Sequence, residues 1–411
     1  GAMLAALLLS VGQAGPATGG TYVAIGGSNT CGHGVAEGGA FQYRLAVALR
    51  SAGVASTHVN KCLPAMGPTY AAACARAILP ANMTFATVEF LPNMRDELGH
   101  DLNAFKRLLR YLADRGVRTV VVQILPMWRH AALAQVDAPM QATARELGFP
   151  VVMVDQARPE EAGLFLEDGT RHLNGKGHQE VTRRVLEAAR GLRAPAPAPV
   201  QEGAVRNDTA MARCYLGRDV RKAVLEAKGF SEVDISGERR QGKYAWQAVE
   251  PGSELRLCAG DLRGYRSPRI SLGYQKSHVR NPPLMGMATA ACEGCACTVT
   301  WRGFKPSPEC RPHNCTFDGL HKRKRLLTTV TDFAVLTPLK SKEGFATAPG
   351  AREGCPCVLV VRNPPQPAPR QRVVIRAFVV GETHETLFAN KFHFRFASVA
   401  EAFRRRRLRA R

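Results

Sequence analysis

The feature that most constrains the fold is a glycine-rich turn between an apolar run and a helical pattern. The run is Thr21–Ile25, the turn is Gly26-Gly27-Ser28-Asn29-Thr30, and the helical pattern is Phe41–Ala52. A strand, a turn that carries a serine and then a helix form a unit that raises a hydroxyl above the end of an α/β sheet. The alternative is an ordinary turn in which Ser28 only caps the following segment.

Short apolar runs alternate with amphipathic segments from residue 21 to about residue 190. The predicted strands are Thr21–Ile25, His58–Asn60, Thr84–Leu91, Val117–Leu125 and Val151–Asp155. The predicted helices are Phe41–Ala52, Thr69–Leu79, Leu102–Arg115, Asp137–Leu147 and Lys176–Leu192. Runs such as Val120-Val121-Val122 indicate strands buried on both faces, which predicts a parallel sheet between two helix layers. Functional loops are then expected at the carboxyl ends of the strands.

The second half of the chain predicts a different architecture. Ala194–Pro199 alternates alanine and proline, as semi-rigid linkers do. After one predicted helix, Asp219–Lys228, turn residues separate short β-rich runs, which predicts a β-sandwich. These runs are Glu254–Cys258, Arg269–Tyr274, Cys297–Trp301, Leu327–Leu336, Cys357–Arg362 and Val373–Val380.

The predicted organisation has five parts. An apolar segment, 1–20, precedes an α/β domain, 21–192, a linker, 193–203, a cysteine-rich β-sandwich, 204–387, and a basic tail, 388–411. Met3–Val11 resembles the core of a signal peptide but lacks a basic flank. No run of 18 apolar residues predicts a membrane span.

Charge and cysteine content bear on partners and location. The formal net charge of +22 favours polyanions such as acidic polysaccharide, and no nucleic-acid-binding motif accompanies it. Twelve cysteines and the sequons at Asn82, Asn207 and Asn314 favour an oxidising compartment. We therefore expect a protein of the secretory pathway that is secreted, retained in the Golgi lumen or displayed at the cell surface.

Three further stretches combine with the serine turn. Lys61–Gly67 follows the second predicted strand, Val88–Met94 follows the third with Asn93 at its tip, and Asp168–His178 precedes the last predicted helix of the domain. In this order Ser, Gly, Asn and Asp/His resemble the four blocks of the SGNH (GDSL-like) hydrolases over residues 20–192. The Gly-Gly-Ser-x-Thr and Val-Glu-Phe-x-x-Asn blocks, with a C-terminal β-domain, also resemble SGNH-hydrolase-type proteins of algae and protists.

The resemblance implies a role for each matching residue. Ser28 would be the nucleophile, His172 the general base and Asp168 the carboxylate that orients it. The oxyanion hole would combine the backbone N–H groups of Ser28 and Gly67 with the side-chain amide of Asn93. The resemblance also implies a flavodoxin-like three-layer α/β/α fold and requires neither cofactor nor metal.

The chain departs from the family pattern in three blocks. Gly27 stands where an aspartate usually precedes the serine, and the third block keeps only Asn93. Asp168 lies four residues before His172 instead of three, so a Ser–His dyad remains an alternative to a triad. Each residue also has a purely structural interpretation. Asn93 could cap the segment that follows it, Gly67 could be an ordinary turn glycine, and His172 could be a histidine of a surface loop.

Other histidines and aromatic residues are weaker candidates. His178 is expected to pack or to cap the last helix, and His33 or Arg129-His130 could line the mouth of a pocket. Aromatic side chains of the second domain could stack on sugars, or could belong to the sandwich core. These residues are Trp246, Trp301, Tyr244, Tyr265 and Tyr274.

The cysteines of the second domain favour disulfides over a metal site. Cys292, Cys295 and Cys297 contain a C-x-x-C, and Cys310, Cys315, Cys355 and Cys357 follow, but the spacing is not that of a zinc finger. In the first domain, Cys62 and Cys74 bracket the second block and are predicted to pair.

The sequence therefore predicts a serine esterase that acts on a carbohydrate ester, with an acetyl group on a polysaccharide as the expected substrate. One alternative is an O-acyltransferase that uses the same serine and histidine. Another is a non-catalytic glycan-binding or surface protein on a degenerate SGNH scaffold.

Overall fold

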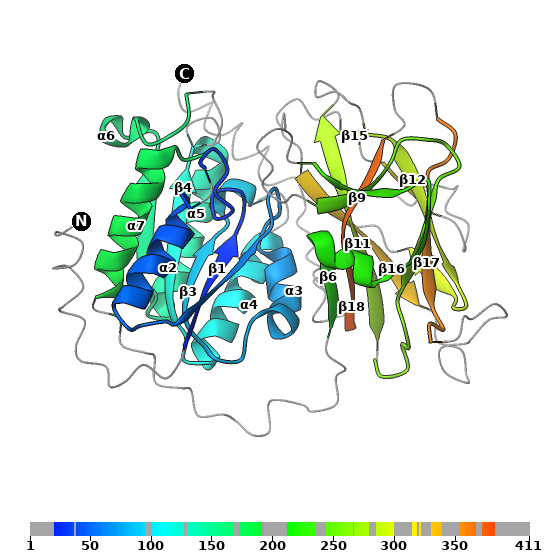
Figure 1. Cartoon of the computed structure of the whole chain (residues 1–411), viewed down its shortest axis with the longest axis horizontal. Coiled ribbons are helices and arrows are strands. Elements are labelled where there is room, and N and C mark those ends of the chain that lie inside the picture. The colour runs from blue at the N-terminus through cyan, green and yellow to red at the C-terminus, as the bar shows by residue number, and fades with distance from the viewer. Residues whose placement is uncertain are drawn as a thin grey trace, which may run out of the picture.

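The computed structural model describes the greater part of the chain as two units that lie side by side (Figure 1). One is an α/β unit, and the other consists of antiparallel sheets. The described residues are 20–36, 38–94, 100–126, 130–167, 172–190, 192, 212–235, 244–265, 267–278, 285–299, 315–318, 320–321, 330–338, 354–366 and 372–382. The predicted linker, the basic tail and the first 19 residues lie outside these ranges.

The α/β unit is built on a sheet of five parallel strands in the order β2-β1-β3-β4-β5. All five predicted strands are present, although the bounds differ by a few residues. They are β1 (Thr21–Gly26), β2 (Thr57–Cys62), β3 (Met83–Glu89), β4 (Arg118–Leu125) and β5 (Val151–Asp155). This order is the flavodoxin-like arrangement that was predicted.

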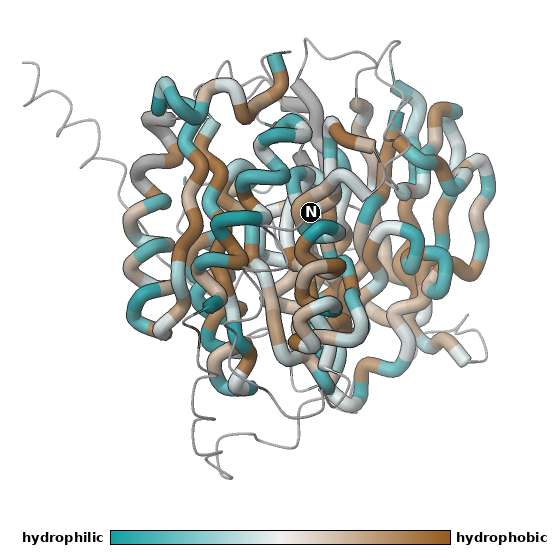
Figure 2. The backbone as a smooth tube through the Cα atoms, turned by 60° about the vertical axis from the view of Figure 1, so that its left-hand side comes forward, coloured by the Kyte–Doolittle hydropathy of each residue, from teal (hydrophilic) through white to brown (hydrophobic). Residues whose placement is uncertain are grey.

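Helices cover both faces of this sheet, as the alternation of side chains along β1 requires. Val23 and Ile25 point into one apolar cluster, and Tyr22 and Ala24 point into the other. The hydrophobic segments accordingly run through the central strands (Figure 2). The helices are α2 (Phe41–Ser51), α3 (Thr69–Ile78), α4 (His100–Asp114), α5 (His130–Glu146), α6 (Pro159–Ala162) and α7 (Gly175–Ala189). No helix in the described ranges is long and apolar enough to cross a membrane.

The second unit is a β-sandwich, as predicted. One sheet has the order β14-β12-β17-β10-β7, and the other runs β13-β16-β11-β18-β9-β8, with β6 added to β18 and β15 to β11. An apolar core of residues from both sheets lies between them. The strands are β6 (Arg213–Leu216), β7 (Val224–Lys228), β8 (Ser231–Asp234), β9 (Tyr244–Ala248), β10 (Glu254–Cys258), β11 (Pro268–His278), β12 (Met287–Glu293), β13 (Cys297–Val299), β14 (Cys315–Asp318), β15 (Leu320–His321), β16 (Val330–Pro338), β17 (Val358–Arg362) and β18 (Val373–Glu382).

The predicted helix Asp219–Lys228 is wrong. A 3₁₀ helix, η4, covers Gly217–Lys222, and β7 then pairs with β10. The apolar residues Val220, Ala223, Val224 and Ala227 have helical spacing, but Val220 and Ala223 already bury themselves in the sandwich core from the 3₁₀ turn. The remaining residues, Val224–Lys228, then pair with the edge of β10 as strand β7. This pairing is a tertiary interaction, and the local spacing of apolar residues cannot predict it.

The second face of the larger sheet packs against the α/β unit. Ala377 of β18 belongs to the apolar cluster of the α/β unit, and Val379 packs with Ala73 and Cys74 of α3. A disulfide joins Cys74 to Cys214 of β6 across this contact. The two units therefore share a buried interface.

Candidate active site

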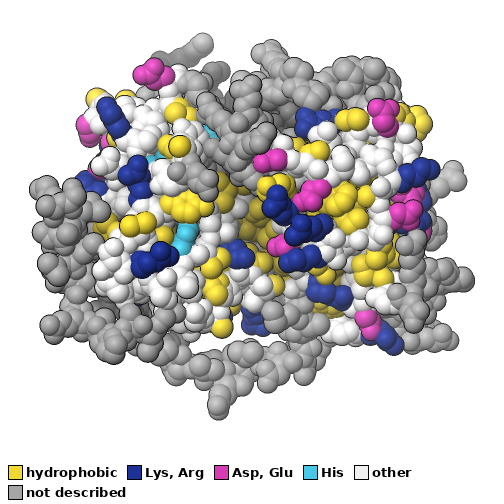
Figure 3. Space-filling model, in the orientation of Figure 1, with side chains coloured by type: hydrophobic (Ala, Val, Ile, Leu, Met, Phe, Trp, Pro, Cys, Tyr) yellow, Lys and Arg dark blue, Asp and Glu magenta, His cyan; other side chains and the backbone are white. Residues whose placement is uncertain are grey.

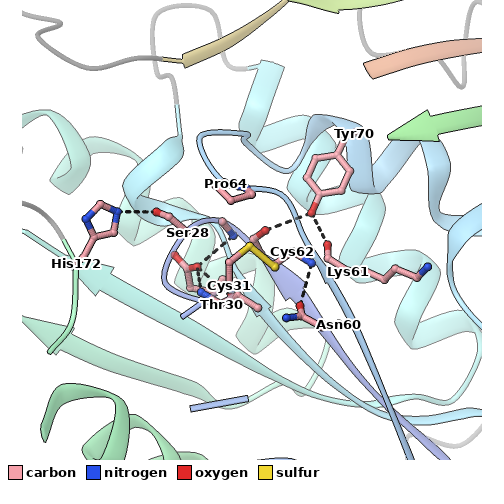
Figure 4. Close-up of a disulfide and its surroundings, with 12 residues drawn as sticks. Ser28, Thr30, Cys31, Asn60, Lys61, Cys62, Pro64, Tyr70 and His172 are labelled. Carbon is pink, nitrogen blue, oxygen red and sulfur yellow. Dashed lines mark hydrogen bonds between the residues drawn. A yellow bond between two sulfur atoms is a disulfide. The ribbon is translucent and has the colours of Figure 1, made fainter. Parts of the chain in front are cut away.

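Ser28 and His172 meet at the carboxyl edge of the parallel sheet. Ser28 lies in the turn that follows β1, and His172 lies in the loop before α7. The Oγ of Ser28 and the Nε2 of His172 are 2.8 Å apart, within hydrogen-bond distance (Figure 4). The two residues are 144 positions apart in the sequence, so the fold itself creates the pair.

The loop that carries His172 is tied down on both sides. The His172 carbonyl accepts from the Leu166 N–H at 3.0 Å, and the Leu173 N–H donates to Asn29 Oδ1 at 2.9 Å. Asn174 caps α7 by accepting from the Gly177 N–H at 3.0 Å. Since Asn29 is adjacent to Ser28, the contact with Leu173 couples the serine turn directly to the histidine loop.

The turn that carries Ser28, residues 26–33, needs both of its first glycines because other groups approach the backbone closely. A Cβ on Gly26 would lie 2.1 Å from Thr30 Oγ1, and a Cβ on Gly27 would lie 2.0 Å from Asn93 Nδ2. At these distances a Cβ could be accommodated only if the neighbouring side chain moved. Gly27, which departs from the aspartate of the family pattern, therefore leaves the space that the Asn93 amide occupies. We call residues 26–33 the Ser28 turn.

A carboxylate from the neighbouring strand organises the Ser28 turn. Glu89 ends β3 and is fully buried. Its Oε2 accepts from the Gly27 N–H at 3.2 Å, the Thr30 N–H at 3.3 Å and the Thr30 hydroxyl at 3.0 Å. Burial, followed by the charge of Glu89, raises the pKa of the Tyr70 hydroxyl well above its usual range. Sequence reasoning missed Glu89 as a site residue, although an acidic residue at the end of a buried apolar strand is a usable signal.

Asn93 brings an amide to the same place. It ends a short 3₁₀ helix, η1 (Leu91–Asn93), directly after β3, and is 7% exposed. Its Nδ2 lies against Gly27 and has no hydrogen-bond acceptor within the described part of the chain. A buried amide donor without an acceptor is uncommon, because it costs the desolvation of the N–H groups. The amide is thus available to an oxygen atom bound beside Ser28.

The second block forms a tight loop, Leu63–Gly67, which we call the Pro64 loop. The Leu63 N–H donates to the carbonyl of Gly26 at 2.9 Å, and this contact attaches the loop to the end of β1. Gly67 lies against the first turn of α4, where a Cβ would sit 3.0 Å from an oxygen of Asp101. The Asp101 carboxylate also accepts from the Thr69 hydroxyl at 2.6 Å.

The disulfides confirm that the cysteines pair, but they correct one pairing. Cys62 bonds to Cys31 and Cys74 bonds to Cys214, so the predicted Cys62–Cys74 bridge is wrong. Register explains the difference: Cys62 pairs with Gly26 of β1 in the sheet, which places it beside the Ser28 turn (Figure 4). The second unit contains Cys258–Cys355, Cys292–Cys297 and Cys295–Cys357. The last four of these sulfur atoms lie within 4.8 Å of one another.

The remaining candidates divide into three groups. Asp168, Arg129 and Trp301 lie outside the described residues, as does the side chain of His130. His33 packs its ring against His172, with ring centroids 3.8 Å apart. His178 is buried and accepts from the Phe41 N–H, and burial lowers its pKa to about 4, which confirms its packing role.

The aromatic residues of the second unit belong largely to its core. Tyr265 and Tyr274 are buried there, and Trp246 packs against this core from a partly buried position. Tyr244 lies under the guanidinium of Arg218, with 3.8 Å between that group and the ring centroid. The core interpretation of Tyr265 and Tyr274 therefore holds.

The architecture defines the class of fold: a flavodoxin-like three-layer α/β/α unit joined to a β-sandwich, which is the fold that the resemblance to the SGNH hydrolases predicts. A solved two-domain esterase active on acetylated mannans is similar over 88% of this chain and 91% of its own, with a TM-score of 0.52 and 19% identity. The same kind of esterase co-crystallised with mannopentaose gives a TM-score of 0.53 and 18% identity, over 88% and 90% of the two chains. No protein-family model and no curated protein sequence matches the chain.

Proposed function

We propose that the protein is a serine esterase of SGNH type that removes an acyl group, an acetyl in the first instance, from a hydroxyl of a carbohydrate. The observation that carries the proposal is the 2.8 Å contact between Ser28 Oγ and His172 Nε2 at the carboxyl edge of the sheet. An imidazole at this distance can accept the proton of the hydroxyl as the oxygen attacks a carbonyl carbon.

The proposed reaction has two halves. Ser28 Oγ attacks the ester carbonyl while His172 takes its proton, and collapse of the tetrahedral intermediate expels the sugar hydroxyl, which receives that proton from His172. Water then attacks the acyl-enzyme, with His172 again as base. The carboxylic acid is released, and the Ser28 hydroxyl regains its proton from His172. Asp168 keeps its proposed place as the carboxylate that orients His172.

The negative charge on the tetrahedral oxygen needs donors. Asn93 Nδ2 supports this role, because it is buried against Gly27 and has no acceptor among the described residues. The backbone N–H groups of Ser28 and Gly67 are proposed as its partners. A neutral amide can donate to a transient charge without itself changing protonation, and loss of one such donor costs about 10²–10³ in rate.

The carbohydrate part of the proposal has separate support. The two similar two-domain structures are described as an esterase active on acetylated mannans and as its co-crystal with mannopentaose. The net charge of +22 extends the proposal to glycans with acidic groups. Figure 3 shows basic side chains of the second unit interspersed with acidic ones on one face, so a single basic patch does not dominate that view.

The five disulfides among the described residues favour a secretory location.

The deciding experiment compares the wild type with Ser28→Ala and His172→Ala on p-nitrophenyl acetate and on acetylated mannan, with released acetate measured. Ser51→Ala, at the exposed end of α2, is the matched control. We expect both site variants to lose at least about 10³-fold in kcat/KM and the control to keep full activity. Turnover that survives Ser28→Ala would rule out the acyl-enzyme. Inactive wild type that still binds mannan oligosaccharides would favour the non-catalytic alternative.

A further inference from the structure

A side chain of the β-sandwich reaches the Pro64 loop of the α/β unit. Arg376 of β18 is buried, with 3% exposure, and its Nη1 donates to the carbonyl of Pro64 at 2.7 Å. The two residues are 312 positions apart in the sequence. Burial lowers the pKa of the guanidinium to about 10, which still leaves it charged at neutral pH. Burying a cation costs desolvation free energy, so the group that accepts its hydrogen bond is expected to have a structural or functional role.

The backbone of β18 aims Arg376 out of its sheet. Gly273 of β11 pairs with Ala377, but Tyr274 pairs with Ile375, so the register shifts at Arg376. A bulge of this kind inserts one extra residue into the strand and redirects its side chain. Ile375 and Phe378 enter the sandwich core, whereas Ala377 and Arg376 face the α/β unit.

The target of Arg376 is the central peptide of a strained turn. The Met66 N–H donates to the Leu63 carbonyl at 3.3 Å, which closes a four-residue turn with Pro64 and Ala65 at its centre. Ala65 has a φ of +61° and is the one non-glycine residue of the described ranges with positive φ. Proline in the second position and positive φ in the third are the marks of a type II turn, which normally has glycine or asparagine where this chain has Ala65.

Alanine in this position favours a different turn. Types I and II differ by a flip of the central peptide, and type I would return Ala65 to negative φ and turn the Pro64 carbonyl away. The hydrogen bond from Arg376 holds that carbonyl in the type II direction. Gly67, whose N–H is a proposed oxyanion donor, lies only two residues beyond Ala65.

We propose that Arg376 is a positioning residue that holds the Pro64–Ala65 peptide in its type II orientation and thereby sets the oxyanion side of the site. This inference rests on the proposed esterase function for its catalytic consequence. It makes the β-sandwich a structural component of the active site as well as a candidate for glycan binding. A flipped peptide would displace the Gly67 N–H while leaving Ser28 and His172 in place.

The test is a double-mutant cycle between Arg376→Met and Ala65→Gly, with kcat and KM on p-nitrophenyl acetate. Glycine accepts positive φ without strain, so it removes the need for the clamp. We expect Arg376→Met to lower kcat by about 100-fold in the Ala65 background but only about tenfold alongside Ala65→Gly, with KM within about twofold. Val379→Ala, on the same strand and in the same interface, is the control that lowers Tm without lowering kcat.

A second readout separates this inference from the esterase proposal. Hydrogen exchange of the peptide that contains residues 63–67 should accelerate in Arg376→Met and slow again when Ala65→Gly is added. This result does not depend on turnover, so it stands even if the wild type hydrolyses no ester. An equal loss of kcat in both backgrounds, or unchanged exchange in Arg376→Met, would overturn the proposal.

Discussion

The Ser28 turn and the Pro64 loop lie at the same edge of the sheet, but different parts of the chain stabilise them. The Ser28 turn is held from within the α/β unit, by Glu89 of the adjacent strand and by Asn29. The Pro64 loop is held by Arg376 of the sandwich, and the Cys31–Cys62 disulfide links the Ser28 turn to the end of β2, next to that loop. One half of the site is therefore local to the domain, and the other half depends on the association of two units.

This difference predicts which part of the site each kind of substitution should disturb. A change within β3 should disturb the serine and leave the interface of the two units intact. Loss of the contact between Arg376 and Pro64 should disturb the Pro64 loop and leave the contact between Ser28 and His172 intact. The two sets of variants can thus be told apart by whether Ser28 still reacts with a fluorophosphonate, a reaction that needs the serine and histidine above all.

The largest expected effect comes from the two disulfides that border these regions. Removing Cys74–Cys214, whose cysteines are 140 residues apart, should lower the free energy of unfolding by about 5 kcal/mol, and removing Cys31–Cys62, 31 apart, by about 4 kcal/mol. Activity should respond in the opposite order. The Cys31→Ala/Cys62→Ala variant frees the Ser28 turn from β2, so kcat/KM should fall at least about tenfold.

Urea denaturation would measure the stability of the two variants, and esterase assays below the melting temperature of each would measure their activity. Together they test whether the two variants rank in opposite orders. The Cys74→Ala/Cys214→Ala variant serves as the control for the Cys31–Cys62 pair, and the reverse. If the two variants lost activity in proportion to their stability, the distinction between the two regions would be lost.

The next largest effect is expected at Glu89. Glu89→Ala removes the acceptor of the Thr30 N–H and hydroxyl in a fully buried site, which should cost about 4 kcal/mol of unfolding free energy and at least about 100-fold in kcat/KM. Glu89→Gln keeps an oxygen but loses the charge, so its loss of stability should be about half as large.

Thr87→Val provides the matched control for Glu89. Thr87 is fully buried two residues earlier on β3, and its hydroxyl bonds to that of Tyr22, away from the Ser28 turn. Its loss should cost about 1 kcal/mol without a change in kcat. Equal activity in Glu89→Ala and Thr87→Val would show that the carboxylate does not organise the serine.

The contrast between the two regions also explains what the sequence could predict. Alternating apolar runs predicted the parallel sheet, since its central strands β1, β3 and β4 are buried on both faces. The order of the sequence blocks led to Ser28, His172 and Asn93. Sheet register is absent from such patterns, so the partner of Cys62 was missed. Arg376 carried no signal at all, because its role depends on a strand bulge and on a loop 312 residues away.

The smallest expected change in free energy concerns Gly27, which stands where the family pattern has an aspartate. A Cβ there would lie 2.0 Å from Asn93 Nδ2, so Gly27→Ala must displace that amide by about 1 Å or more. Misplacement on this scale can cost about 100-fold in rate, and we expect kcat to fall by that factor while KM changes little.

Gly175→Ala is the control for this substitution, because a Cβ at the start of α7 meets no atom within 4 Å. A Gly27→Ala enzyme with normal kcat would mean that Asn93 does not stabilise the transition state. If kcat falls as expected, Asn93→Ala in the Gly27→Ala background should lower it little further, because the amide has already been displaced. That non-additivity would show that glycine replaces the family's aspartate at position 27 because the Asn93 amide occupies the space. It would also assign the Asn93 amide to the part of the site that is held from β3, together with the Ser28 turn.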